Sequence, residues 1–244
     1  MNEICVKAQG IFKRFYLLKK RSTLLNVLKA VLRRESLRSE LWVLRDVSFS
    51  VGKGDKVAII GKNGAGKTTL LRIISGIYDK TAGCLEVNER PLAIFKFLIG
   101  LNVHLLVVDN IYLLGSLYGI PKEVLRVKED AILETAELKH LKFSVFKKLS
   151  TGQQQRLALS VFFQVKGDFF IFDESTSLVD LNFAHKCEAY FNRLFSPQTT
   201  VLMTSHDNSL LRKYCTKALW LQDGRVKIYG GIENVLKEYE QDIR

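Results

Sequence analysis

The sequence predicts an α/β fold, in which a mostly parallel sheet is joined by an antiparallel β subdomain and an inserted helical subdomain. The chain contains three short segments that are apolar at nearly every position: 56–60, 169–172 and 200–203. Such segments are typical of parallel strands that are covered on both faces. Segments 3–9 and 47–51 alternate between apolar and polar residues, which is typical of strands at a sheet edge. Over about 104–160, apolar residues recur at roughly helical intervals.

A helix is also expected between the first two edge strands, over 17–40. Its apolar positions at helical spacing are Leu24, Leu25, Val27, Leu28, Val31 and Leu32. Its basic positions are Lys19, Lys20, Arg21, Lys29, Arg33, Arg34 and Arg38. A basic amphipathic helix suits an anionic membrane surface. The alternative is a helix that packs on its own domain with a solvated basic face.

We expect one domain over 1–244, because a chain of this length has room for a single domain with a substantial insert. The helical subdomain over about 104–160 is marked by Leu114, Leu117, Leu125, Ile132, Ala136 and Leu138. Near the end of the chain, 217–229 predicts a hairpin that turns at Gln222-Asp223-Gly224.

Composition and charge narrow the class of protein. Apolar residues make up 47% of the chain and charged residues 25%, which excludes a disordered or fibrous protein. The formal net charge is +12, and 1–56 holds 13 basic and 5 acidic side chains. Such a basic segment suggests a polyanionic partner: nucleic acid, an acidic membrane surface or a phosphorylated lipid carrier. The four cysteines are far apart, which favours a reducing compartment over disulfides or zinc.

The stretch Gly61-Lys62-Asn63-Gly64-Ala65-Gly66-Lys67-Thr68 fits the pattern G-x-x-x-x-G-K-[ST] in full. It lies between a predicted strand and a predicted helix, the context that a phosphate-binding loop requires. Its main-chain N–H groups and the positive end of the following helix suit phosphate oxygens. We expect Lys67 to reach the β- and γ-phosphates and the Thr68 hydroxyl to ligate Mg²⁺. The expected nucleotide-binding residues are Gly61, Asn63, Gly64, Ala65, Gly66, Lys67, Thr68 and Thr69. A structural glycine-rich turn is the alternative.

Two carboxylates, Asp173 and Glu174, follow the apolar segment 169–172. Asp173 at the carboxyl end of the strand is suited to hold Mg²⁺. Glu174 is suited to activate a water for attack on the γ-phosphate. A strand that ends in an acidic loop is common, so this interpretation depends on the phosphate loop about a hundred residues earlier.

The segment Leu149-Ser150-Thr151-Gly152-Gln153-Gln154-Gln155-Arg156 opens a helical stretch. It resembles the signature of the ATP-binding subunits of ABC transporters, close to L-S-G-G-Q-Q-Q-R, with Thr151 replacing the first glycine. The resemblance implies an ATPase with a P-loop core, in which the signature of one protomer closes on the ATP of the other. Ser150, Gly152 and Gln153 would then contact ATP. An ordinary serine cap before an amphipathic helix is the alternative.

Further residues match this family in the same order along the chain. Segment 173–180, D-E-S-T-S-L-V-D, resembles the family's D-E-P-T-S-A-L-D, which implies that Asp180 is a dimer contact at the ATP site. His206 matches the switch histidine that contacts the γ-phosphate and orients Glu174, so both are expected to be catalytic. Phe15 matches the aromatic residue that stacks on adenine. Tyr16 is its rival, and either residue is also suited to packing in an edge strand.

The match fails where the family has a glutamine that senses the permease and the γ-phosphate. The nearest residue is Asn102, which keeps the amide but is one methylene shorter. The resemblance implies that Asn102 helps to position Mg²⁺, and the substitution puts this role in doubt. The segment 105–108, L-L-V-V, is unusually apolar. It is either a docking face for a permease helix or part of the packing inside the helical subdomain.

The insert 17–40, the segment 41–49 and the run 110–113 resemble the subunits that export O-antigen, capsular or teichoic-acid polysaccharides. The resemblance implies that the chain binds ATP and Mg²⁺ and forms a homodimer under an integral-membrane permease. It would be peripheral at the cytoplasmic face of the inner membrane, with a lipid-linked polysaccharide as substrate and no nucleic acid partner. Two alternatives stay open. The chain exports another substrate, such as a lipid or drug, or it is a soluble ABC ATPase that acts on nucleic acid or the ribosome.

Overall fold

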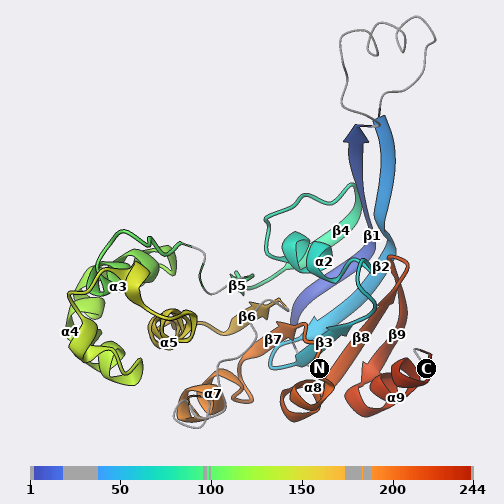
Figure 1. Ribbon diagram of the computed structural model, residues 1–244. Helices are drawn as coiled ribbons and strands as arrows, with labels where there is room; N and C mark the ends of the chain where they lie inside the picture. The colour runs from blue at the N-terminus through green and yellow to red at the C-terminus, as the bar shows by residue number, and fades with distance from the viewer. Residues whose placement is uncertain are drawn as a thin grey trace, which may run out of the picture. The chain divides into compact units, whose positions relative to one another are not determined.

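The computed structural model describes residues 3–18, 38–95, 98, 100–173, 183 and 188–242. The chain divides into two compact units (Figure 1). The first consists of 1–53, 57–88 and 211–244, and the second of 54–56 and 89–210. Within the described residues, no helix has the length and apolar character needed to cross a bilayer.

An antiparallel sheet in the first unit has the strand order β2-β1-β4. These strands are β1 (Ile4–Leu18), β2 (Arg38–Gly52) and β4 (Ala82–Val87). Val6 of β1 lies opposite Val51 on one side and Val87 on the other. Figure 1 shows β1 and β2 as a long two-stranded ribbon. The predicted antiparallel subdomain is therefore present, with strands longer than the alternating segments 3–9 and 47–51. The expected edge position is wrong for 3–9, because β1 pairs with a strand on each side and is the central strand of this sheet.

The prediction of a helix over 17–40 is wrong at both ends. Leu17 and Leu18 lie in β1, and residues 38–40 lie in β2. Leu17 pairs with Ser39, and Tyr16 pairs with Glu40. The paired main chains extend the ribbon beyond the segments in which apolar and polar residues alternate. The residues 19–37 lie outside the described part of the chain.

A second strand group in the first unit positions the phosphate loop. It contains β3 (Lys56–Ile60), which is buried throughout, β8 (Lys217–Gln222) and β9 (Arg225–Gly231). β3 and β8 are parallel, and β8 and β9 form the predicted hairpin. Its turn residues, Asp223 and Gly224, have φ of 49° and 76°, as the tight hairpin turn for an Asp-Gly pair requires. The helix α9 (Ile232–Asp242) buries Val235 and Leu236 against this hairpin.

The second unit contains a parallel group of strands in the order β5-β6-β7. These are β5 (Leu92–Ile94), β6 (Phe169–Phe172) and β7 (Thr200–Met203), and α7 (Glu188–Leu194) precedes β7. Every residue of β6 and β7 is buried. The continuous apolar segments 169–172 and 200–203 are thus confirmed as buried parallel strands.

Three helices of the second unit pack on one another: α3 (Val107–Leu117), α4 (Lys122–Thr135) and α5 (Thr151–Phe162) (Figure 1). Short 3₁₀ turns at Lys139–Leu141 and Phe146–Lys148 connect α4 to α5. Leu114, Leu125 and Ile132 are at most 1% exposed, as their spacing predicted. Leu117 also lies in α3, as its helical spacing predicted, but it is 60% exposed in the last turn.

Candidate functional site

The predicted phosphate loop connects β3 to α2 (Lys67–Ile74) in the first unit. The Lys67 ammonium group is buried inside the loop and donates hydrogen bonds to the carbonyl oxygens of Gly61, at 2.7 Å, and Lys62, at 3.4 Å. The first N–H groups of α2 have no partner within the helix, as at every helix start. The loop therefore presents a lysine and a helix amino terminus together, which fits a bound phosphate.

Two glycines of this loop are required by the space around them. Gly61 has φ of 146°, and a Cβ there would lie 2.2 Å from the carbonyl oxygen of Leu221 in β8. Gly66 has φ of 105°, and its Cβ would lie 2.6 Å from a methyl carbon of Leu44 in β2. Any side chain at either position would push the loop away from the strands that support it. The glycine pattern thus follows from tight packing of the loop against its own unit.

The outer side of the loop is open. Asn63 and Gly64 are exposed, and a Cβ on Gly64 would meet no atom within 4 Å. Thr68 and Thr69 are half-buried at the start of α2. A cavity of about 310 Å³ lies beside the loop, and it is lined by 62–65, by 220–223 of the hairpin and by Asp242. The hairpin residues were not among the predicted site residues, because only the fold places them beside the loop.

Phe15 and Tyr16 occupy neighbouring positions in β1, so their side chains point to opposite faces of the ribbon. The Phe15 ring meets Tyr78 edge to face, with centroids 5.6 Å apart, and the Lys13 ammonium lies 4.9 Å from the Phe15 centroid. Tyr78 follows α2 and accepts a hydrogen bond from Arg72 of that helix. Tyr16 instead lies 5.0 Å from the Arg14 guanidinium and is 53% exposed. Phe15 is thus the aromatic residue on the face that carries α2, and its role in stacking on adenine remains a prediction.

The predicted metal ligand Asp173 follows β6 in the second unit and is 6% exposed. Its Oδ1 accepts a hydrogen bond of 2.9 Å from the hydroxyl of Thr204, which follows the neighbouring strand β7. A buried carboxylate held at the carboxyl end of a strand suits a magnesium ion, which prefers oxygen ligands. Among the residues that the structure describes, there is no cluster of three or more His, Cys, Asp or Glu side chains at metal-binding distance.

Of the predicted catalytic residues, the structure describes His206 but not Glu174. His206 lies two residues after Thr204 and is exposed. Asp207 accepts a hydrogen bond of 2.8 Å from the N–H of Ser209, at the start of α8 (Asn208–Tyr214), and this fixes the direction in which the chain leaves the histidine. Glu174 and Asp180 lie outside the described residues, and their roles remain predictions.

The predicted signature forms the amino terminus of α5. Ser150 caps the helix: its Oγ accepts from the N–H of Gln153, at 3.3 Å, and the Gln153 side chain accepts from the N–H of Ser150, at 2.9 Å. Leu149 is buried and anchors the segment, whereas Ser150, Thr151 and Gly152 are exposed. A Cβ on Gly152 would meet no atom within 4 Å. Ser150 is thus an ordinary serine cap of a helix, which was the alternative to a nucleotide contact. The exposed amino terminus of the helix also suits an anion.

Asn102 has a different partner from the predicted Mg²⁺. Its Oδ1 accepts a hydrogen bond of 2.9 Å from the N–H of His104, two residues later, in a local turn. The nearby apolar segment is partly buried, as packing inside the helical subdomain requires, and partly exposed, as a docking face for a permease helix requires. Val107 is fully buried, whereas Leu105 and the adjoining Val103 are 37% and 42% exposed. The role of Asn102 in positioning Mg²⁺ remains a prediction.

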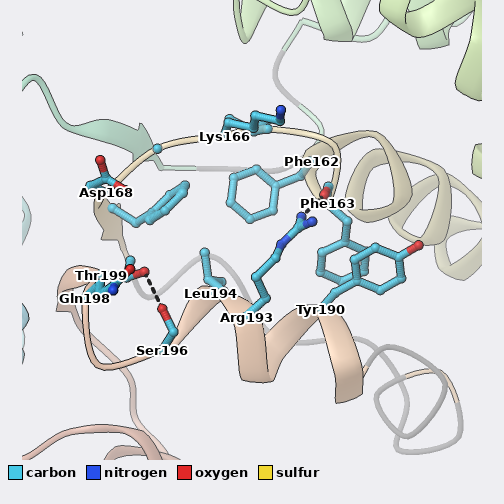
Figure 2. Close-up of a pocket in the computed structure, with 13 residues that line it drawn as sticks. Phe162, Phe163, Lys166, Asp168, Tyr190, Arg193, Leu194, Ser196, Gln198 and Thr199 are labelled. Atoms are coloured by element: carbon cyan, nitrogen blue, oxygen red, sulfur yellow. Dashed lines mark hydrogen bonds between the residues drawn. The ribbon is translucent and has the colours of Figure 1, made fainter.

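A second cavity, of about 320 Å³, lies at the other ends of the strands in the second unit (Figure 2). Asp168, just before β6, and Thr199, just before β7, line it, whereas Asp173 and Thr204 follow these strands. Phe163 and Tyr190 stack in parallel at its rim, 4.7 Å apart, and Arg193 donates a hydrogen bond to the Phe163 carbonyl oxygen. Because it lies at the amino ends of the strands, this cavity is not part of the predicted nucleotide site.

The sequence of the loop and its flanks decides the family. Residues 44–177, more than half of the chain, match the family model described as ABC transporter. The chain belongs to the ABC transporter family. This confirms the family that the phosphate loop and the signature resemble.

Curated relatives within the ABC family cover most of the chain. It is 31% identical over 243 residues to the teichoic acids export ATP-binding protein TagH of Lactococcus lactis subsp. lactis, covering 100% of this chain and 52% of that protein. It is 32% identical over 198 residues to the O-antigen export system ATP-binding protein RfbB of Klebsiella pneumoniae, covering 81% of this chain and 80% of that protein. The chain thus spans about half the length of TagH and most of the length of RfbB.

Solved ABC structures show the same fold. The structure titled ATP binding subunit of ABC transporter matches with a TM-score of 0.71 at 20% identity, covering 97% of this chain and 93% of that chain. The ATP-binding cassette MJ0796, solved as a dimer in a post-hydrolysis state with ADP and Pi, matches with a TM-score of 0.69 at 21% identity. It covers 93% of this chain and 98% of that chain. The predicted α/β fold of an ABC ATPase core is confirmed.

Proposed function

We propose that the chain is the ATP-hydrolysing subunit of an ABC exporter that moves a lipid-linked polysaccharide across the cytoplasmic membrane. The observation that carries this proposal is the complete phosphate loop between β3 and α2, with the Lys67 ammonium held inside it. On binding ATP, this ammonium exchanges the carbonyl oxygens of Gly61 and Lys62 for oxygens of the β- and γ-phosphates. The N–H groups at the start of α2 complete the contact.

The remaining catalytic roles follow from the chemistry of each side chain. Thr68 and Asp173 are proposed to hold Mg²⁺, whose charge offsets that of the phosphates. Thr204 keeps the Asp173 carboxylate in one orientation through its hydrogen bond. Glu174 accepts the proton of the attacking water, and His206 contacts the γ-phosphate and orients Glu174. Phe15 is proposed to stack on the adenine, with Tyr16 as the less favoured candidate.

A homodimer is part of the proposal, since each ATP would need residues from two copies. Ser150, Gly152 and Gln153 at the exposed amino terminus of α5 would face the phosphates that the other copy holds. The small side chain of Ser150 and the open space at Gly152 support this role. Asp180 is proposed as the contact between the copies.

Similar proteins and an exposed apolar patch support a membrane permease as partner and a polysaccharide as substrate. The similarity to TagH and RfbB, whose names refer to teichoic acids and O-antigen, favours a polysaccharide and a membrane permease. Val103, Leu105 and Phe143 are exposed apolar residues on two segments of the second unit that are joined by main-chain hydrogen bonds. Such a patch suits an apolar permease helix. The chain would then lie at the cytoplasmic face of the inner membrane, bound through the permease.

The test of ATP hydrolysis uses the purified chain and the variant Glu174→Gln. We expect the wild type to hydrolyse ATP and the variant to bind ATP with normal affinity but to lose about 10²–10⁴-fold in rate. Sedimentation should show that the variant dimerises when ATP is added. Asp168→Asn, an exposed carboxylate at the other end of β6, is the control and should keep the wild-type rate. Normal hydrolysis by Glu174→Gln contradicts the catalytic role.

The substrate is tested in the source cell by deleting the gene and measuring surface polysaccharide. We expect lipid-linked polysaccharide to accumulate inside the cell and to be exported again when the wild-type gene, but not Glu174→Gln, is restored. Normal surface polysaccharide, with loss of another exported lipid or drug, favours the first alternative. Co-sedimentation of the chain with ribosomes or nucleic acid, instead of membranes, favours the second.

A further inference from the structure

The side chain of Asn110 is fully buried in the first turns of α3, and all of its hydrogen-bonding groups are used. Its Nδ2 donates to the carbonyl oxygens of Asn102, at 3.0 Å, and Leu106, at 2.9 Å. Its Oδ1 accepts from the N–H of Asn102, at 2.7 Å. Asparagine is a poor residue for a helix interior, and burying its amide is costly unless each group is paired. One amide thus fixes both main-chain groups of Asn102, eight residues earlier.

The loop that Asn110 holds is paired with the segment 142–147. The carbonyl oxygens of Val103 and Leu105 accept from the N–H groups of Lys147, at 3.0 Å, and Phe146, at 2.8 Å. In the other direction, the N–H groups of residues 107 and 108 donate to the carbonyl oxygens of residues 144 and 142, at 2.9 and 3.1 Å. These bonds surround an antiparallel bridge between Leu106 and Val145. The loop and the segment therefore form a short two-stranded ladder.

The ladder leads directly to the signature. The turn Phe146–Lys148 contains the last paired residues of the ladder, and Leu149 donates its N–H to the carbonyl oxygen of Phe146, at 3.0 Å. Ser150 then caps α5, and the Gln154 side chain donates to the carbonyl oxygen of Leu149, at 3.2 Å. Each described residue between the ladder and the cap is therefore hydrogen-bonded to a residue nearby in the sequence. A shift of the loop 102–106 would therefore be transmitted to Ser150.

We propose that Asn110 is a positioning residue that fixes the loop 102–106 and, through the ladder with 142–147, sets the position of the signature at Ser150. Asn110 would act through the main-chain groups that it holds, because its amide is fully buried and bonded to Asn102 and Leu106. Its amide joins the part of the second unit that carries the exposed residues Val103 and Leu105 to the helix terminus that would face ATP in the other copy. This inference rests on the proposed function for its effect on catalysis, but its structural part does not.

The first experiment compares Asn110→Ala with the matched control Ile132→Ala. Ile132 is fully buried in α4, so its truncation also destabilises the helical group but leaves the ladder intact. In Asn110→Ala we expect faster amide exchange at Val107, Phe146 and Gln153. We also expect kcat to fall by about 2- to 30-fold, the range found for residues that couple sites. The affinity of the monomer for ATP should not change, because the phosphate loop belongs to the other unit. Ile132→Ala should change none of these at temperatures where it is folded.

A disulfide across the ladder provides a rescue. Leu106 and Val145 form a non-hydrogen-bonded antiparallel pair, whose Cα atoms are typically about 4.5 Å apart, within the range for a disulfide. We replace both by cysteine in the Asn110→Ala background, with Cys84 and Cys187 changed to serine to prevent other pairings. Oxidation should restore slow exchange at residues 146–153 and raise kcat, and dithiothreitol should reverse both effects.

Each outcome decides a separate question. If the wild type hydrolyses no ATP, the proposed function fails, and the exchange data still test the ladder. If exchange at residues 146–153 is the same in Asn110→Ala and wild type, the positioning role is wrong. It is also wrong if Ile132→Ala produces the same changes, or if the oxidised disulfide slows exchange without raising kcat. A kcat that falls in Asn110→Ala and recovers on oxidation supports the proposal, because general loss of stability would not follow the redox state of one cross-link.

Discussion

The hydroxyl of Thr204 donates a hydrogen bond of 2.9 Å to Oδ1 of Asp173, and this bond joins the carboxyl ends of two neighbouring parallel strands. The N–H of Thr204 also donates to the carbonyl oxygen of Phe172, one residue before Asp173, at 2.9 Å. Both side chains are buried, at 6% and 2% exposure. The carboxylate that is proposed to hold Mg²⁺ is therefore oriented by its neighbour strand before any ligand binds.

Replacing Thr204 by valine tests this arrangement. Valine keeps the shape of the side chain but removes the hydroxyl, so a buried carboxylate loses a donor. We expect the free energy of unfolding in urea to fall by about 1–3 kcal/mol at neutral pH. ATP hydrolysis should also need a higher Mg²⁺ concentration. The control is Thr135→Val, whose hydroxyl bonds only within its own helix and is exposed. An unchanged Mg²⁺ requirement would show that the hydroxyl has no part in the metal site.

The choice between Phe15 and Tyr16 for the adenine is tested by replacing each with leucine. Leucine keeps apolar volume but removes the ring, and stacking of a base on an aromatic ring is worth about 1–3 kcal/mol. Phe15→Leu should therefore weaken ATP binding by about 5- to 150-fold, measured by calorimetry with a non-hydrolysable analogue. Tyr16→Leu should leave the affinity unchanged, because Tyr16 lies on the opposite face of β1. A stronger effect of Tyr16→Leu would reverse the assignment.

Glu129 links α4 to α3 and to the segment before the signature, and this contact depends on pH. Burial raises the pKa of its carboxyl, but hydrogen bonds from Lys142 and Tyr112 outweigh burial, so the pKa is lowered. A lowered pKa means that the contribution to stability is full above the ordinary pKa of glutamate and is lost as the pH falls through the folded-state pKa. Glu129→Gln should lower the free energy of unfolding by about 1 kcal/mol at pH 7.

The difference between Glu129→Gln and wild type should disappear as the pH falls below the acidic range in which Glu129 is protonated. Urea titrations at several pH values measure this difference. The control is Glu134→Gln, an exposed residue of the same helix without an ion pair among the described residues. A difference that stays constant down to pH 2 would show that the charge of Glu129 contributes nothing.

The parts of the fold that were predicted correctly share one physical property. The strands at 56–60, 169–172 and 200–203 are buried throughout, so the apolar runs 57–60, 169–172 and 201–203 mark their positions in the sequence. The Asp-Gly turn of the final hairpin is equally local, because its two positive φ angles are required by the turn itself. The phosphate loop is a contiguous sequence pattern, although its Gly61 and Gly66 are required by contacts with Leu221 and Leu44.

The parts that were missed depend on contacts between distant residues. The ribbon of β1 and β2 extends through Leu17 and Glu40 because the strands pair, and pairing leaves no periodic signal in one strand. Asn110 was noted only as part of a family run, since its partners at Asn102 and Leu106 are known only once the loop is folded. Thr204 lies two residues before His206, and the family pattern marks only the histidine. A buried polar residue next to a predicted strand end is the signal that would have singled it out.

The last prediction concerns Asn102, for which the sequence implied contact with Mg²⁺ and the structure shows a turn. Its main-chain groups are held by Asn110, whereas its side-chain oxygen accepts a hydrogen bond from the N–H of His104. A turn cap needs a short acceptor, so Asn102→Asp should keep the turn, and Asn102→Gln should weaken it because the longer side chain places its oxygen elsewhere. A metal ligand would behave differently, since Asn102→Ala would then raise the Mg²⁺ concentration needed for half-maximal hydrolysis. We expect this concentration to be the same in wild type and Asn102→Ala, measured at saturating ATP, with Asp173→Asn as the variant that raises it. A shift in Asn102→Ala comparable to that in Asp173→Asn would return Asn102 to the metal site, and it would mean that the side chain leaves the turn when nucleotide binds.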